Sequence, residues 1–384
     1  MVSAPEVRQE PEKPPSTEDL YKQLAEEGPL RPGIATAKSN IDVKNSDLYD
    51  PKLIAEGKEF VRRHYASVVV SHLIVMMWAL AIKYIRLLIL HNDGGYAEDH
   101  AKTRSRYLIS ILRIMKWFDG DYDTPASSSN TTDILGFSST MDLETVRKIH
   151  YLVAKNHKLK PKPVLPKLTP KQEEVLKAVR KEMEGIDMSV APDYVKKLED
   201  PAIPLSQFPM AAAQALFMGL VGAFPEKFGM PDTNGLDGYV HLWAIIGRQL
   251  GVDDQFNWAL YYKKTKSLAP VKDLYQKFIL PSLKVMDETS IIMVQDFIDG
   301  VADYVLVIRF LPVLKYMLTV CELEGSSLDH LMDWKDRLSY WFIKINLHVL
   351  HKYRLTRIFQ NWLIRMFLLY GSRRYLPANF RKYE

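Results

Sequence analysis

Cysteine is almost absent from this sequence, because Cys321 is the only one among 384 residues. A single thiol excludes an internal disulfide and any structural zinc site built from several thiolates. Such a chain is typical of a reducing compartment, and a lumenal protein with few cysteines fits as well. The opening segment MVSAPEVRQEPEKPP lacks an apolar run, so we expect neither a cleavable signal nor a membrane anchor there.

The sequence also lacks the short motifs of several common enzyme classes. It contains no glycine-rich phosphate loop, no G-x-S-x-G turn, no H-E-x-x-H pair and no C-x-x-C pair. A carboxylate-bridged di-iron site needs Glu-x-x-His motifs on helices, and no Glu in this chain is followed by a His at that spacing. Alternating apolar and polar positions, which are typical of strands, are nearly absent as well.

Helical patterns cover most of the chain, so we predict one all-α domain over residues 47–384. Apolar residues make up 47% of the sequence, which is enough for a sizeable core. Residues 1–46 are rich in Pro, Glu, Lys and Ser, and we expect them to form a disordered N-terminal arm. A Pro-rich linker, 158–171, interrupts the domain. The expected helices cover about 66–82, 97–118, 143–156, 169–183, 205–223, 236–250, 253–264, 271–279, 291–320 and 327–370.

The segment 66–82 is a run of 17 residues without a formal charge. A membrane-spanning helix needs about 20 apolar residues, and His72 and two serines interrupt this run. Lys83 and Arg86 follow directly, as cations do at a membrane edge or at the end of any helix. We therefore favour a buried helix over a membrane span.

The C-terminal residues 341–384 are strongly basic, since they hold nine Lys or Arg and one acid. Their net charge of +8 exceeds that of the whole chain, +5, so the remaining residues are slightly acidic. The charges alternate with apolar residues in a predicted basic amphipathic helix, 327–370. Two interpretations stay open: a core helix with a solvated basic side, or a helix that contacts an acidic membrane surface. Nucleic acid is not expected, because no nucleic-acid-binding motif accompanies the charge.

Three polar residues on predicted helices are candidates for a binding site. His150 lies at the border of an apolar helix face, where a neutral imidazole can bind haem iron or another metal, or simply pack in the core. Arg106 and Ser110 are four residues apart and share a helix face. An inward-facing arginine needs an anionic partner, which a haem propionate, a bound carboxylate or an ordinary salt bridge could supply.

Four segments, taken together and in order, resemble those of one known family. Their order and spacing are similar to the rubber-oxygenase (latex clearing protein) catalytic-domain family, which includes an endoplasmic-reticulum oxygenase that shortens a farnesyl chain in mycophenolic acid biosynthesis. The resemblance runs from about Asp50 to at least Asn257. The segments are Asp50-Pro-x-Leu-Ile, Arg106-Tyr-Leu-Ile-Ser110, Val146-Arg-Lys-Ile-His150 and His241-Leu-Trp-Ala-Ile-Ile-Gly-x-x-Leu-Gly-Val-x-Asp-x-Phe-Asn257.

The resemblance implies an all-α fold around a b-type haem that oxygenates or cleaves isoprenoid double bonds with dioxygen. His150 matches the family's proximal iron ligand, so it is the expected metal-binding residue. Arg106 and Ser110 match an Arg-x-x-x-Thr pair that lines the haem pocket, with Ser in place of Thr. Segments 68–80 and 214–220 could supply the apolar cage.

Two departures from the family pattern affect the expected chemistry. Ile109 stands where bacterial members have a lysine that can act as distal haem ligand, so we expect the distal position to be open or taken by water or another group. The nearest acids upstream of Arg106 are Glu98 and Asp99, and neither can be matched to a catalytic carboxylate of the family.

Two hypotheses of different classes follow. The first is a haem b-dependent oxygenase whose partners are dioxygen and an unsaturated apolar, isoprenoid-like substrate, with His150 as proximal ligand and peripheral membrane contact through the basic C-terminus. The second is a non-catalytic helical module that binds lipid or another hydrophobic ligand at a membrane. Either would reside in the cytoplasm or at the endoplasmic-reticulum membrane.

Overall fold

A computed structural model describes residues 15–34, 42–90, 99–122, 138–156, 166–203, 205–378 and 380. Within these residues the chain forms helices and no β-strand, which confirms the predicted all-α class. The α-helices are α1 (Thr17–Glu27), α2 (Pro51–Arg63), α3 (Tyr65–Ala81), α4 (Lys83–Leu90), α5 (His100–Asp119), α6 (Ser139–Asn156), α7 (Pro170–Glu182), α8 (Asp193–Lys196), α9 (Gln207–Ala223), α10 (Leu236–Leu250), α11 (Trp258–Thr265), α12 (Ala269–Leu274), α13 (Leu280–Lys284), α14 (Glu288–Ala302), α15 (Phe310–Val320), α16 (Trp334–His348) and α17 (Arg354–Tyr375). Short 3-10 turns are η1 (Gly28–Leu30), η3 (Pro225–Phe228), η4 (Asp254–Phe256), η6 (Ser326–Leu331) and η7 (Leu350–Lys352), and η5 (Tyr275–Ile279) is a π-helical turn.

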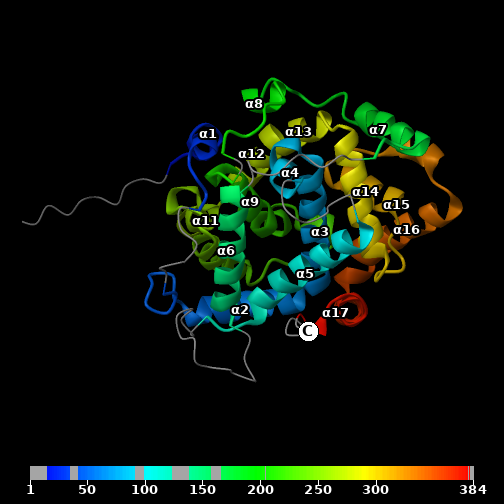
Figure 1. Cartoon of the computed structure of the whole chain (residues 1–384). Coiled ribbons are helices and arrows are strands. Elements are labelled where there is room, and N and C mark those ends of the chain that lie inside the picture. The colour runs from blue at the N-terminus through cyan, green and yellow to red at the C-terminus, as the bar shows by residue number, and fades with distance from the viewer. Residues whose placement is uncertain are drawn as a thin grey trace, which may run out of the picture.

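Helix α3 lies in the middle of the molecule, where α9 and α14 pack against it (Figure 1). Thirteen of its 17 residues are buried, because no charge interrupts the apolar run and protein can cover every side of the helix. No single helix in the described ranges is long and apolar enough to cross a membrane. Helices α2 and α3 reach that length and composition only as a pair, and they meet at 87°.

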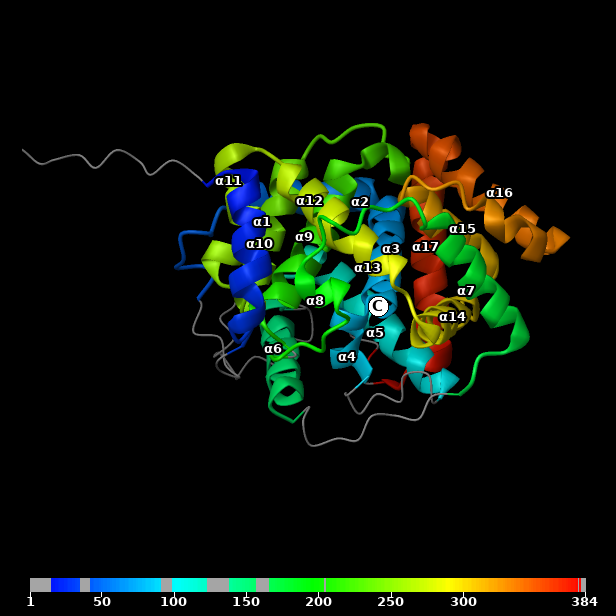
Figure 2. The same ribbon diagram turned by 90° about the horizontal axis from the view of Figure 1, so that it is seen from above.

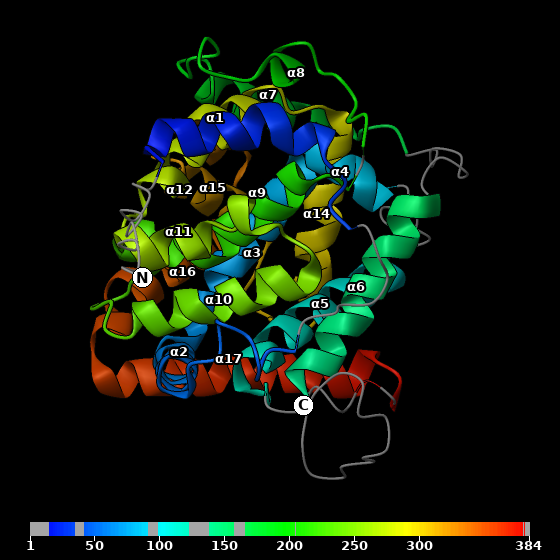
Figure 3. The same ribbon diagram turned by 90° about the vertical axis from the view of Figure 1, so that its left-hand side faces the viewer.

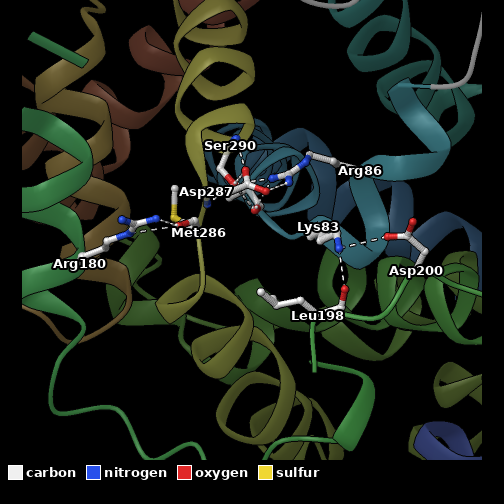
Figure 4. A network of polar contacts seen from close by, with 9 residues as sticks. Lys83, Arg86, Arg180, Leu198, Asp200, Met286, Asp287 and Ser290 are labelled. Carbon is white, nitrogen blue, oxygen red and sulfur yellow. Dashed lines mark hydrogen bonds and ion pairs between the residues drawn. The ribbon is translucent and has the colours of Figure 1, made fainter. Parts of the chain in front are cut away.

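The two cations that follow α3 bind to the protein itself (Figure 4). Arg86 is only 3% exposed, and its guanidinium pairs with Asp287 and donates a hydrogen bond to Ser290. Lys83 forms an ion pair of 3.1 Å with Asp200. These contacts attach α4 to the beginning of α14 and to the loop before α9. The two cations therefore bind carboxylates of the protein where the buried helix α3 ends.

Helix α1 corrects the expected N-terminal boundary. Residues 1–46 were expected to be disordered, but 17–27 within them form a helix that begins with a hydrogen bond from the Asp19 N–H to the Ser16 hydroxyl. Its side chains Leu20, Tyr21 and Leu24 are buried against the rest of the protein. The polar composition hid this short apolar stripe, which is too narrow to raise the mean hydropathy of the segment.

Two long helices expected near the C-terminus are each broken into two. The helix predicted over 291–320 ends at Ala302, and α15 begins at Phe310. The helix predicted over 327–370 is replaced by η6, α16 and α17, with the turn η7 between α16 and α17. His351 in that turn is buried, and its Nδ1 lies 2.6 Å from Gln360 Oε1. The turn is therefore fixed by a buried polar pair that helical periodicity does not reveal.

Helix α10 packs directly on α2, as Figure 3 shows. Two glycines make this approach possible, because a Cβ added at Gly57 would lie 2.4 Å from the Gly238 carbonyl oxygen. Helix α6 lies at one edge of the molecule, and α16 lies at the opposite edge in the view of Figure 2. Helix α17 lines the periphery and contacts α2, α3 and α5 on its inner side.

Candidate functional site

Helices α5 and α6 bring the three predicted site residues, Arg106, Ser110 and His150, to one pocket. Arg106 and Ser110 lie one turn apart on α5, and His150 comes from α6, which packs against α5. The pocket has a volume of about 540 Å³. Sites for small molecules commonly enclose roughly 300–1,000 Å³, so this size suits an organic ligand. The three residues therefore meet, and their roles stay predictions.

The His150 imidazole faces this pocket and makes no hydrogen bond with the residues that the structure describes. Its Nδ1 atom is buried without a partner. Burial, reinforced by the nearby Arg113 guanidinium, lowers the pKa of His150 to about 4. The ring is therefore neutral at pH 7, which is the form that binds a metal ion or haem iron.

A second arginine, Arg113, also lines the pocket, and it is not among the site residues predicted from the sequence. It lies two helical turns after Arg106, so both guanidinium groups share one side of α5. Its Nε lies 3.6 Å from one oxygen of Asp142, and the Trp117 indole N–H donates a hydrogen bond of 2.8 Å to the other. This buried carboxylate holds Arg113 at the wall, and the two arginines suit a ligand that carries an anionic group.

A buried amide pair supports the far wall of the pocket. The Gln214 side-chain amide donates hydrogen bonds to the Asn257 side chain at 2.7 Å and to the Trp243 carbonyl at 2.8 Å. Gly247 makes room for it, because an added Cβ would lie 2.1 Å from Gln214 Nε2. Both expected cage segments contribute, since α3 supplies Met76, and α9 supplies Gln214 and Phe217. The apolar lining residues are Met76, Ile109, Ile114, Trp117, Val146, Ile149, Met210, Ala213, Phe217, Trp243, Ile246, Leu250, Val252 and Phe380.

A smaller cavity lies behind the α5 wall and encloses about 70 Å³. It shares the lining residues Met76, Ser110 and Ile114 with the His150 pocket, so the two spaces are neighbours. Its other lining residues come from α3, α5, α14, the segment that follows α14, and α17, and they are almost entirely apolar. A cavity of this kind suits hydrocarbon better than water.

Other histidines do not join His150 in this pocket. His72 is fully buried beside Phe217, with ring centroids 5.0 Å apart, and burial lowers its pKa to about 3. His241 is buried near the beginning of α2 and does not line the pocket. His157 lies outside the described residues. Across the described ranges, no group of three or more His, Cys, Asp or Glu residues could hold a metal ion.

No protein-family model matches the chain, and comparisons with curated proteins and with solved structures found nothing similar to it. A haem needs one nitrogen ligand, a cation for its carboxylates and an apolar cage. The pocket contains residues of each kind: the His150 imidazole as a nitrogen ligand, two arginines as cations, and apolar walls. A bare metal ion would need more protein ligands than this pocket offers.

Proposed function

We propose that this protein holds a b-type haem in the His150 pocket and oxygenates an unsaturated, isoprenoid-like substrate with dioxygen. The observation that carries the proposal is a neutral imidazole that lacks a hydrogen bond from the described residues and faces an apolar pocket of about 540 Å³. An imidazole left unpaired in such a place costs free energy unless a ligand satisfies it. A haem iron would do so.

Each polar residue of the pocket has a role in this proposal. His150 is the iron ligand, and its low pKa keeps the ring free of a competing proton. Arg106 and Arg113 bind the two haem carboxylates through charge-assisted hydrogen bonds. The Ser110 hydroxyl donates a hydrogen bond of 2.9 Å to the Arg106 carbonyl, so it offers the pocket only its oxygen lone pairs.

The apolar walls of the pocket support the proposed class of substrate. When bound, haem supplies an iron centre that activates dioxygen. The task left to the protein is to exclude water and to orient an alkene, which Phe217, Trp243 and Met76 can do by apolar contact. The smaller cavity, which shares Ser110 and Ile114 with the pocket, adds about 70 Å³ of apolar space beside it.

The test is the visible absorption spectrum of the full-length chain purified from cells supplied with a haem precursor. We expect a Soret band in the wild type and its loss in His150→Ala. We also expect its return when imidazole is added to His150→Gly, because free imidazole can occupy the vacated position. His330→Ala, an exposed change on η6, is the matched control and should keep the band. A folded His150→Ala protein that retains full haem would overturn the proposal.

The same pocket supports a second candidate, a non-catalytic site for a lipid or another hydrophobic ligand. Two arginines beside apolar walls suit one carboxylate on an apolar chain, and none of the described lining residues is an Asp or Glu that could act as a general base. A wild type without a Soret band would favour this candidate. It should then bind a fluorescent fatty acid, about tenfold more weakly after Arg106→Gln and equally well after His150→Ala.

A further inference from the structure

Helices α16 and α17 point their large apolar side chains outward. We name this set of side chains the outer stripe. Leu355 is 82% exposed and Trp334 is 70% exposed, whereas the residues of α3 are mostly buried. Clusters of exposed apolar side chains on this scale mark a contact surface. The outer stripe consists of Trp334, Leu338, Trp341, Phe342, Ile345, Val349, Tyr353, Leu355, Ile358, Phe359, Trp362, Met366 and Tyr370.

Polar contacts on the inner side fix this orientation of α17. The buried Asn361 accepts a hydrogen bond of 2.9 Å from the Ala66 N–H, and its amide donates one of 2.9 Å to the Arg63 carbonyl. Gly371 lets the helix approach the body, since an added Cβ would lie 2.9 Å from the Tyr304 ring. The inner side of α17 therefore includes Asn361, Leu368 and Gly371, and its outward side carries exposed Trp, Phe and Leu side chains.

The charge around the outer stripe has one sign. Seven Lys or Arg and no Asp or Glu occur between residues 341 and 378. Lys352, Arg354 and Arg365 form no ion pair with any residue that the structure describes. Lys344 Nζ lies 5.6 Å from the centre of the Trp341 ring, so cation and aromatic ring share one face of α16.

We propose that the outer stripe docks this protein onto the surface of an anionic lipid bilayer. Tryptophan and tyrosine favour the interface between headgroups and hydrocarbon, and lysine and arginine beside them bind anionic headgroups. A second copy of the chain fits poorly, because a symmetric contact would place one basic surface on another. The proposal does not depend on haem.

The part of the outer stripe on α17 lies on the opposite side of that helix from the smaller cavity. Ile364 and Leu368 on the inner side of α17 line that cavity, which meets the His150 pocket at Ser110 and Ile114. An apolar molecule dissolved in the bilayer would thus be held one helix away from the candidate site. This arrangement gives a reason for the docking surface and the apolar site to occur in one protein.

The experiment is flotation of the full-length chain with vesicles of phosphatidylcholine, with and without phosphatidylserine. We expect binding that is strongest with phosphatidylserine and that weakens at high salt, since salt screens the charges. The triple change Lys352→Glu, Arg354→Glu and Arg365→Glu should lower the partition coefficient for phosphatidylserine vesicles by about 100-fold. Trp341→Ser with Trp362→Ser should lower binding to both vesicle types at least about tenfold.

The control changes the same charge elsewhere, by Lys52→Glu, Lys177→Glu and Lys181→Glu on exposed sites of α2 and α7, and it should bind like the wild type. Circular dichroism checks that every variant is folded. The proposal is wrong if the wild type binds neither vesicle type. It is also wrong if the triple variant is folded and binds as well as the wild type. A dimer that Trp341→Ser with Trp362→Ser dissociates, without vesicle binding, would assign the surface to a second copy.

Discussion

The long uncharged helix α3 and the helices that face outward with apolar side chains are different parts of this molecule. Helix α3 has no formal charge and lies inside the protein between α9 and α14. Helices α16 and α17 carry many charges, yet their Trp, Phe and Leu side chains are exposed. The comparison teaches that mean hydropathy reports how much apolar surface a helix has, and not what covers it.

The loss of unfolding free energy on removing an aromatic ring should differ most clearly between the two regions. Trp78 on α3 is fully buried, so Trp78→Ala leaves a cavity and should lower the free energy of unfolding by about 3–5 kcal/mol. Trp341→Ala on α16, where the side chain is 58% exposed, should change it by less than about 0.5 kcal/mol. Urea unfolding measures both. Equal losses would mean that the outer stripe is covered within the protein.

The interior around α3 also contains neutral histidines, whose effect appears on acidification. Burial lowers the pKa of His150 from 6.5 to about 4, so the unfolded chain binds a proton at a higher pH than the folded one. Its contribution to stability is complete above pH 6.5 and is lost as the pH falls through 4. We expect His150→Gln to reduce the acid-induced loss by about 2–3 kcal/mol. Urea unfolding of the haem-free protein between pH 4 and 7 tests this. If the free energy of unfolding depends on pH in the same way in His150→Gln and in the wild type, the prediction is wrong.

Breaking the ion pairs of Arg86 and Lys83 should lower the free energy of unfolding least, and by different amounts. Asp287→Ala would leave the buried Arg86 without its carboxylate and should cost about 1–3 kcal/mol. Lys83→Ala breaks a half-exposed pair with Asp200 and should cost less than about 1 kcal/mol. Thermal or urea unfolding distinguishes them. A larger loss for Lys83 would reverse the assignment of Arg86 as the anchor of α4.

Most of the fold could be predicted from helical periodicity, because a buried apolar face repeats along the sequence whatever covers it. The all-α class and the bounds of α3, α9 and α10 follow from that repeat. The break near His351 could not be predicted from that repeat. A buried hydrogen bond to Gln360 fixes it, and neither residue is a helix breaker. Helix α1 was missed because its three buried side chains lie among charged ones.

The candidate site was predictable only in part. The resemblance pointed to Arg106, Ser110 and His150, and the structure places them in one pocket. Arg113 could have been found from its spacing to Arg106 on one helix. The amide pair Gln214 and Asn257 could not, because the two residues meet only where α9 packs against α10 and against the junction of η4 and α11, at the gap left by Gly247.

The burial of Cys321 has a consequence for chemical labelling. The thiol is 3% exposed, and burial raises its pKa to about 12, so it is held as an unreactive thiol at neutral pH. The chain holds no other cysteine. A cysteine introduced at any exposed position would therefore be the only reactive thiol in the folded protein. A spin label at position 342, 359 or 366 would report immersion depth at one known point of the outer stripe.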